Sequence, residues 1–261
     1  MKDLTKRLIT AIVGVIILIG VLLLGIKAVK VAVFIVTLEI IRELYNAFYK
    51  LEIRISLPIL YLSSLITFLF SYFNYNIIFP LIITFLINGF FSIILIKYST
   101  RDMVYTIFSY FYGVFFINLL AYVNEISFLI SAFIIAFSTD TFAYIIGSKF
   151  GKHKLIERIS PHKSVEGAIG GSIFSVIVTW FYFYFVKTHY INFDIDISVL
   201  IIILLASISG QFGDLFASKI KRETGIKDFS QILPGHGGFL DRFDSLIFVC
   251  PFVYFLYYFI S

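Results

Sequence analysis

The stretch from Asp196 to Ile260 reads DISVLIIILLASISGQFGDLFASKIKRETGIKDFSQILPGHGGFLDRFDSLIFVCPFVYFLYYFI, two apolar segments that flank a charged loop. Residues 196–217 and 243–260 each have about the length of 17–25 residues that crosses a bilayer as a helix. The loop between them concentrates charged side chains around a Pro-Gly-His-Gly-Gly turn. Because a simple connection needs no such loop, the stretch predicts two membrane helices that carry a polar site at the water boundary.

The composition of the chain extends this interpretation to all 261 residues. Hydrophobic residues make up 60% and charged residues 14%, whereas soluble domains have roughly 45–50% and 25%. No segment shows the short alternating pattern of a membrane β-barrel. We therefore predict an all-α, polytopic integral membrane protein, a single membrane domain with about nine transmembrane helices. The predicted spans are 8–26, 29–47, 57–73, 76–96, 103–122, 127–148, 168–187, 196–217 and 243–260.

Lysine and arginine are distributed unevenly between the two sides of these spans. All but three of the 21 such residues fall on the side that holds the N-terminus, the exceptions being Lys27, Lys30 and Lys187. Since cytoplasmic loops are enriched in these residues, we predict a cytoplasmic N-terminus, an outside C-terminus and cytoplasmic loops at 149–167 and 218–242. The net charge of +5 makes that face suited to anionic headgroups. A tight turn around Lys27 and Lys30 is expected between the first two spans.

The first polar region runs from Ser138 to Ser172. Asp140 lies nine residues before Lys149, about 13 Å into the bilayer at a rise of 1.5 Å per residue. A carboxylate at that depth costs several kcal/mol unless it is paired, hydrated or bound to metal. With Tyr144 at i+4, it predicts a polar stripe that faces the bundle interior. The structural alternative is a protonated Asp140 bonded to a neighbouring helix.

The end of this region, Ser160-Pro-His-Lys-Ser-Val-Glu-Gly167, precedes the next span. Lys163 and Ser164 are expected to reach phosphate oxygens there, and Glu166 suits the positive end of a helix dipole. Gly167 and Gly171 have the GxxxG spacing that is typical of close helix packing.

The second polar region places carboxylates on two successive predicted helices. Asp214, Ser218, Lys221 and Arg222 recur at i, i+4, i+7 and i+8, so one helix face presents a carboxylate, a hydroxyl and cations. Asp241 and Asp244 lie three residues apart at the start of the last span. Carboxylates from both helices could coordinate Mg²⁺, which prefers oxygen ligands and keeps positions for water and substrate phosphates.

The basic side chains and the glycines of this loop suit a polyphosphate. Five cations would offset its negative charge, and glycines let backbone N–H groups approach phosphate, with His236 as a hydrogen-bonding residue. No Walker-type P-loop is present. A salt-bridged structural loop is the alternative. The residues concerned are Lys219, Lys221, Arg222, Lys227, Arg242, Gly235, His236, Gly237 and Gly238.

These residues resemble a known family, the phosphatidate cytidylyltransferases. The resemblance covers residues 138–248, with Val165 and Phe229 in place of the tryptophan and serine common in the family. Three motifs carry it: Asp140-Thr-Phe-Ala-Tyr144-x-x-Gly147; Ser160-Pro-x-Lys163-Ser164-x-Glu166-Gly167; and Ser218-x-Ile220-Lys221-Arg222, four residues, Lys227-Asp228, then Leu233-Pro234-x-His236-Gly237-Gly238-x-x-Asp241-Arg242-x-Asp244.

The resemblance implies an enzyme that converts CTP and phosphatidic acid to CDP-diacylglycerol and pyrophosphate in phospholipid biosynthesis. It implies nine helices, a homodimer in the inner (plasma) membrane, and Mg²⁺, with K⁺ as a further ion. Residues 1–125 would serve packing, lipid contact and dimerisation, and residues 126–261 catalysis.

The lipid phosphate is already anionic at neutral pH, so positioning and charge stabilisation are what the protein must supply. In the resulting hypothesis Asp214 and Asp241 bind the metal. The predicted catalytic residues are Asp214, Asp241, Asp244, Lys221, Arg222, Lys227 and Arg242, and the predicted substrate-binding residues are Asp140, Tyr144, Lys163, Ser164, Glu166, Ser218, Asp228, Pro234, Gly235, His236, Gly237 and Gly238.

Two other functions remain open at this point. A CTP-dependent polyprenol kinase would release CDP, and a transporter of anionic metabolites could use Asp140 with a basic mouth. Nucleic-acid binding has no support, because the basic residues lie in short loops beside the membrane. Arg42 and Glu43 are predicted to tolerate replacement, as residues of topology and solvation only.

Overall fold

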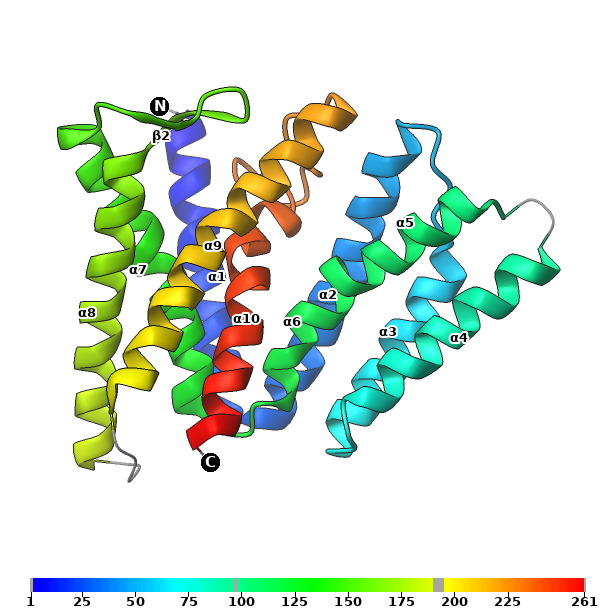
Figure 1. The fold of residues 1–261 in the computed structure, drawn as a ribbon, viewed down its shortest axis with the longest axis horizontal. Coiled ribbons are helices and arrows are strands. Elements are labelled where there is room, and N and C mark those ends of the chain that lie inside the picture. The colour runs from blue at the N-terminus through cyan, green and yellow to red at the C-terminus, as the bar shows by residue number, and fades with distance from the viewer. Residues whose placement is uncertain (1, 96–97, 190–194, 261) are drawn as a thin grey trace. The chain divides into compact units, whose positions relative to one another are not determined.

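The computed structural model describes residues 2–95, 98–189 and 195–260, with side chains from residue 8 and, before the second gap, up to residue 187. The side chains of Lys2, Lys6 and Arg7 and all of Lys97, which support the predicted orientation, lie outside the described residues. The fold is helical (Figure 1). The helices are α1 (Lys2–Leu23), α2 (Ile26–Tyr49), α3 (Leu57–Tyr72), α4 (Ile78–Ile94), α5 (Thr100–Tyr110), η1 (Phe111–Phe115), α6 (Phe116–Asn118), η2 (Leu119–Tyr122), α7 (Ile126–Phe150), α8 (Val165–His189), α9 (Ile197–Thr224) and α10 (Leu240–Ile260).

Each predicted apolar segment is helical over most of its length, which confirms the helical fold class. Within the described residues, five helical segments are long and apolar enough to cross a membrane: 100–122, 126–150, 165–187, 197–224 and 240–260. Shorter apolar helices cover 8–23, 57–72 and 78–94. The protein is therefore a multi-pass membrane protein by the length and composition of its helices.

The chain forms two compact units. Unit 1 comprises Met1–Asn124 with Ile220–Phe243, and unit 2 comprises Glu125–Lys219 with Asp244–Ser261. The second polar loop, with the end of α9 and the start of α10, thus belongs with the N-terminal helices.

In unit 1, α1 and α2 are separated by a break at Gly25, whose φ of +91° is the left-handed conformation that glycine accommodates. The predicted turn around Lys27 and Lys30 is wrong, because both residues lie inside α2. Lys30 is buried, and its ammonium donates to the Ser71 carbonyl and to Asn74 Oδ1, both at 2.7 Å. These bonds offset the cost of burying a cation.

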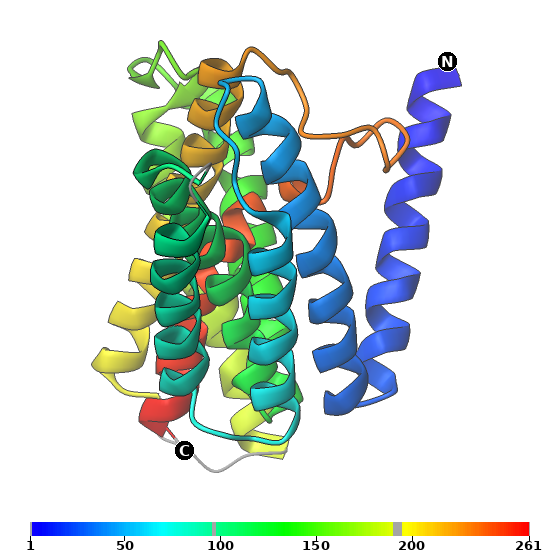
Figure 2. The same ribbon diagram turned by 90° about the vertical axis from the view of Figure 1, so that its right-hand side faces the viewer.

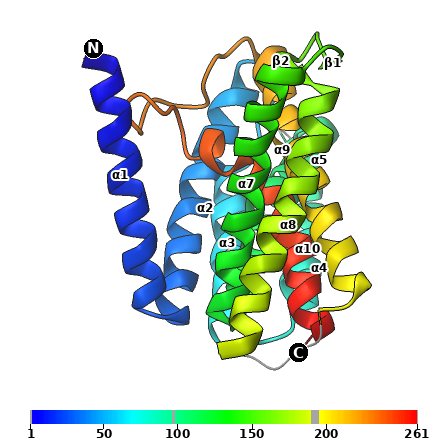
Figure 3. The same cartoon turned by 90° about the vertical axis from the view of Figure 1, so that its left-hand side faces the viewer.

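In unit 2, α7 and α8 run side by side (Figures 1 and 3). Glycines make this approach close: a Cβ at Gly167 would lie 3.0 Å from Gly147 Cα, and one at Gly171 would lie 2.8 Å from Ala143 Cβ. The packing role predicted for Gly167 and Gly171 is confirmed. Before α8, residues 154–164 form an antiparallel hairpin of β1 (Lys154–Ile156) and β2 (Ser160–Ser164).

Candidate active site

In unit 1, Asp241 in the first turn of α10 organises the loop of residues 225–239, the signature loop. Its side chain is 3% exposed. Oδ1 accepts from Lys221 Nζ at 2.6 Å, and Oδ2 accepts from the backbone N–H groups of Phe229 at 2.8 Å and Gly238 at 3.0 Å. Gly237 has φ +80°, and a Cβ there would lie 2.8 Å from Asp241 Oδ2. The glycine therefore lets the loop fold closely around the carboxylate.

A second buried carboxylate, Glu43 of α2, holds the other side of the signature loop. Glu43 has no exposed surface. It accepts from Ser230 Oγ at 2.6 Å and from the N–H groups of Phe239 at 2.9 Å and Leu240 at 2.7 Å. These N–H groups begin α10 and have no partner within the helix, so an anion is favourable there. A Cβ at Gly238 would overlap the Glu43 carboxylate.

The prediction that Glu43 serves only topology and solvation is therefore wrong, because the side chain is fully buried and bonded to the signature loop. The signal that could have revealed it is an acidic residue inside a predicted apolar span, 29–47. Such a residue is costly unless it has donors.

The cations in the signature loop and in the helix ends beside it differ in their surroundings. Lys221 is paired with Asp241 and lies 5.6 Å from the centre of the Phe229 ring. Arg242 is exposed and donates from Nε to the His236 carbonyl at 2.9 Å. Arg222 and Lys227 are exposed.

Further along the loop, the His236 Nδ1 atom is buried without a hydrogen-bond partner among the described residues. The loop reaches α1, where Thr10 Oγ1 donates to the Pro234 carbonyl at 3.0 Å (Figure 2). Gly235 has φ +77°, and Asp228 is exposed.

In unit 2, the structure brings two predicted site residues together. Asp214 of α9 forms an ion pair with Lys163 of β2, at 2.5 Å between Nζ and Oδ2, and both side chains are partly exposed. Ser218 Oγ donates to Asp214 Oδ1 at 3.4 Å. In α10, Asp244 is buried and its Oδ1 accepts from the Ser245 N–H at 2.7 Å.

Ser164 and Glu166 hold the hairpin against the start of α8. Ser164 Oγ accepts from the Gly167 N–H at 3.1 Å, the geometry of an N-cap. Glu166 accepts from His153 Nδ1 at 2.6 Å and from the Lys152 N–H at 3.1 Å. These bonds give Ser164 and Glu166 a structural role at the start of α8. The predicted contacts of both residues with a substrate phosphate stay predictions.

The polar stripe predicted at Asp140 and Tyr144 does not face the interior. Asp140 is exposed, and the Tyr144 side chain is 77% exposed. The α7 face that packs contains Thr139, which bonds Ser207 Oγ at 2.7 Å, and Ala143 against α8. One residue further along a helix turns a side chain by about 100°, which carries Asp140 and Tyr144 off this face.

Asp214 and Asp241, the two predicted magnesium ligands, differ in their remaining capacity to bind a cation. No group of three or more His, Cys, Asp or Glu side chains is placed to hold a metal in the part of the chain that the structure describes. Asp214 accepts from two donors and, with about four lone-pair sites on a carboxylate, keeps capacity for a cation. Asp241 already accepts from three donors. Mg²⁺ often needs only one or two carboxylates besides water and substrate phosphate. Asp214 therefore fits a magnesium ion, and Asp241, with three of about four lone-pair sites in use, fits it less well.

A family profile and similar curated proteins both indicate a cytidylyltransferase. The profile described as "Cytidylyltransferase family" matches residues 5–260. The phosphatidate cytidylyltransferase of Staphylococcus saprophyticus is 44% identical over 158 residues, 59% of this chain and 59% of that protein. Those of Staphylococcus haemolyticus and Staphylococcus aureus are 46% and 48% identical, over 49% and 48% of this chain and 48% and 46% of theirs. The matched part thus spans about half the length of these relatives.

Proposed function

Since the chain belongs to the cytidylyltransferase family, we propose that it transfers the cytidylyl group of CTP to phosphatidic acid. A phosphate oxygen of the lipid forms a bond to the α-phosphorus of CTP, the bond from that phosphorus to the β-phosphate oxygen breaks, and pyrophosphate leaves. The products are CDP-diacylglycerol and pyrophosphate. The names of the relatives support this choice of substrates.

The observation that carries the proposal is the buried Asp241 at the centre of the signature loop. It accepts hydrogen bonds from Lys221, Phe229 and Gly238. Three further cations nearby in the sequence are exposed to solvent: Arg222, Lys227 and Arg242. Lys221 and Arg242 are held by Asp241 and by the His236 carbonyl, and cations held in place can stabilise charge on a triphosphate and on departing pyrophosphate with little reorganisation. Because the attacking lipid phosphate is already an anion, no general base is required.

The proposal includes Mg²⁺, with Asp214 and Asp241 as its protein ligands, Asp244 and Asp140 as further acidic residues, and K⁺ as a further ion. When bound, the metal would offset the charge of the triphosphate. Lys163 would hold the phosphate of phosphatidic acid, and Ser218 would orient Asp214. The residual capacity of Asp214 supports this assignment.

We further propose about nine transmembrane helices, with the N-terminus and the active site at the cytoplasmic face of the plasma membrane, the C-terminus outside, and a homodimer. The distribution of lysine and arginine supports the orientation. Thiol labelling of the variants Ser99→Cys and Tyr75→Cys from either side of sealed vesicles tests it. A reagent added to the cytoplasmic side should modify the Ser99→Cys variant and leave the Tyr75→Cys variant unmodified.

The reaction is tested with purified full-length protein, CTP labelled at the α-phosphate, phosphatidic acid and Mg²⁺. Label should enter the organic phase in the wild type and in Glu157→Gln, a control on the exposed hairpin turn, but not in Asp241→Asn or without metal. Label that remains in the aqueous phase as CDP while a lipid is phosphorylated would indicate a kinase. No consumption of CTP would overturn the proposal and revive the transporter alternative.

A further inference from the structure

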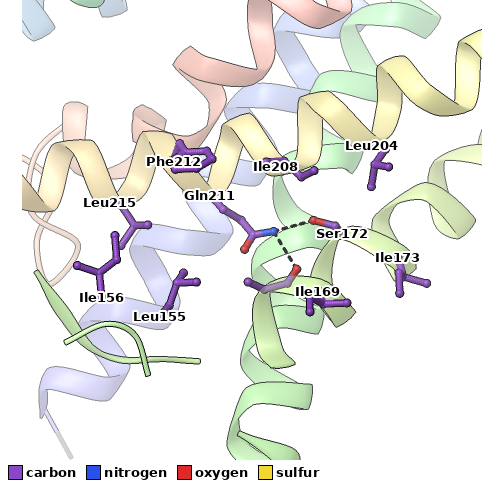
Figure 4. A pocket seen from close by; sticks show the side chains of 11 residues that line it. Leu155, Ile156, Ile169, Ser172, Ile173, Leu204, Ile208, Gln211, Phe212 and Leu215 are labelled. Carbon is purple, nitrogen blue, oxygen red and sulfur yellow. Dashed lines mark hydrogen bonds between the residues drawn. The ribbon is translucent and has the colours of Figure 1, made fainter. Parts of the chain in front are cut away.

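Unit 2 contains a groove between α8, α9 and the start of the hairpin (Figure 4). Its volume is about 330 Å³. Ile169 and Ile173 of α8 line one side, Leu204, Ile208 and Leu215 of α9 line the other, and Leu155 of β1 lies at one end.

The groove is suited to hydrocarbon. The two polar side chains in its lining, Gln211 and Ser172, bond to each other at 2.8 Å, and Gln211 Nε2 also donates to the Ala168 carbonyl at 3.1 Å. These polar groups are thereby satisfied without a ligand. The remaining lining is apolar, and Ile169 and Ile173 are 58% and 51% exposed. A ligand here gains from burial of apolar surface and not from hydrogen bonds.

The length of the groove matches one acyl chain. Leu204, Ile208 and Leu215 recur on one face of α9. From Leu204 to Leu215 the helix rises about 16 Å at 1.5 Å per residue. The hydrocarbon core of a bilayer is about 30 Å thick, so one leaflet contributes about 15 Å.

One end of the groove lies next to the ion pair of Lys163 and Asp214. Leu215 follows Asp214, whose partner Lys163 lies on β2, and β2 pairs with the strand that carries Leu155. The Lys163 ammonium has three donors, directs one to Asp214, and is 25% exposed. It can therefore also donate to an anion at the end where the apolar lining stops. An apolar groove that ends beside a lysine with two remaining donors is complementary to a lipid with an anionic headgroup.

We propose that this groove binds one acyl chain of the phosphatidic acid substrate, with the lipid phosphate at Lys163. The inference rests on the proposed function, since that function makes a diacyl phosphate the substrate. It adds the α8–α9 groove as the binding site of one acyl chain, so that activity should depend on the length of that acyl chain.

Two neighbouring residues of α9 provide a matched test. Leu204 lines the end of the groove away from Lys163, whereas Leu205 is 45% exposed and is not part of the lining. Leu204→Trp should shorten the groove. Its kcat/KM for dioleoyl phosphatidic acid should fall roughly tenfold, the loss expected when about two methylenes are no longer buried. With dioctanoyl phosphatidic acid, which stops before Leu204, it should stay within about twofold of the wild type, and Leu205→Trp should change neither substrate.

The proposal would be overturned if Leu204→Trp had the same effect on both substrates or no effect on either. It would also be overturned if Leu204→Trp changed the oligomeric state without any dependence on acyl-chain length, since the groove would then be an interface between copies of the protein. Leu204→Ala is a second test in case Leu204→Trp does not fold. It widens the groove and should therefore raise activity toward the substrate with the longer acyl chains relative to the shorter one.

A binding measurement separates this inference from the proposed reaction. In a Trp180→Phe background, which removes the single native tryptophan, the fluorescence of Leu204→Trp should be quenched by phosphatidic acid brominated on its chains. Quenching should exceed that by equally brominated phosphatidylcholine, and Lys163→Gln should remove the difference. Equal quenching by both lipids would overturn the groove even if the enzyme makes CDP-diacylglycerol. Stronger quenching by phosphatidic acid in a protein that shows no turnover would support the acyl-chain site and contradict the proposed reaction.

Discussion

The signature loop of unit 1 and the hairpin region 151–164 of unit 2 both carry basic residues at helix ends, but they are held in different ways. The signature loop is fixed by Glu43 and Asp241, each buried and each accepting from three donors. The hairpin is tied through Glu166, which is partly exposed and whose partners are 13 and 14 residues away. Buried charges that lose their donors are costly, whereas exposed pairs contribute little. The signature loop should therefore be far more sensitive to substitution.

The largest effect is expected for Asp241→Asn. The amide cannot accept at both positions, so Lys221 or a loop N–H loses its partner. We expect turnover to fall at least about a hundredfold and the free energy of unfolding to fall by up to about 3 kcal/mol. Labelled product formation and thermal unfolding measure the two quantities. Activity close to the wild type would mean that the carboxylate only shapes the loop.

Glu43→Gln tests whether α2 controls the signature loop. The glutamine amide presents N–H to a backbone N–H, which costs about 1–3 kcal/mol, and kcat/KM should fall about tenfold to a hundredfold. Hydrogen exchange of the Phe239 and Leu240 amides should accelerate at the same time. Glu39→Gln is the matched control, because Glu39 lies on the same helix in a pair with Arg42 at 2.8 Å that is partly exposed. Similar exchange in both variants would contradict a specific role for Glu43.

Gly238→Ala tests the same contact from the side of the loop. The added Cβ would overlap the Glu43 carboxylate, and overpacking of this kind costs about 1–3 kcal/mol. Thermal unfolding should show the loss, with a parallel loss of activity. Gly14→Ala is the control, since a Cβ there has open space. An unchanged unfolding temperature would mean that the loop moves away from α2 without cost.

The smallest effect is expected for Glu166→Gln. Its pair with His153 is partly exposed, and such pairs contribute little to stability. Activity should stay within about threefold of the wild type if the residue only holds the hairpin. A larger fall in kcat/KM for phosphatidic acid, with unfolding unchanged, would show instead that Glu166 acts on the substrate and would remove the contrast between the two regions.

Part of this contrast was accessible from the sequence. The GxxxG spacing predicted the packing of Gly167 and Gly171. Lys163 and Asp214 were both predicted site residues, with different roles, and the structure joins them in an ion pair. The positions of Asp140 and Tyr144 on α7 were also predictable as one stripe. The direction in which that stripe points was not, because it depends on which face of α7 packs against α8.

The helical membrane fold, the approximate range of each helix and the motifs of a cytidylyltransferase could all be predicted from the sequence, because hydropathy, period and spacing are local properties of the chain. Two contacts required the folded structure: Glu43 bonds Ser230, Phe239 and Leu240, which are at least 187 positions away in the sequence, and Lys30 is buried against Ser71 and Asn74. A buried charge is tolerated only where distant donors or acceptors meet it, and that meeting is a property of the packed chain.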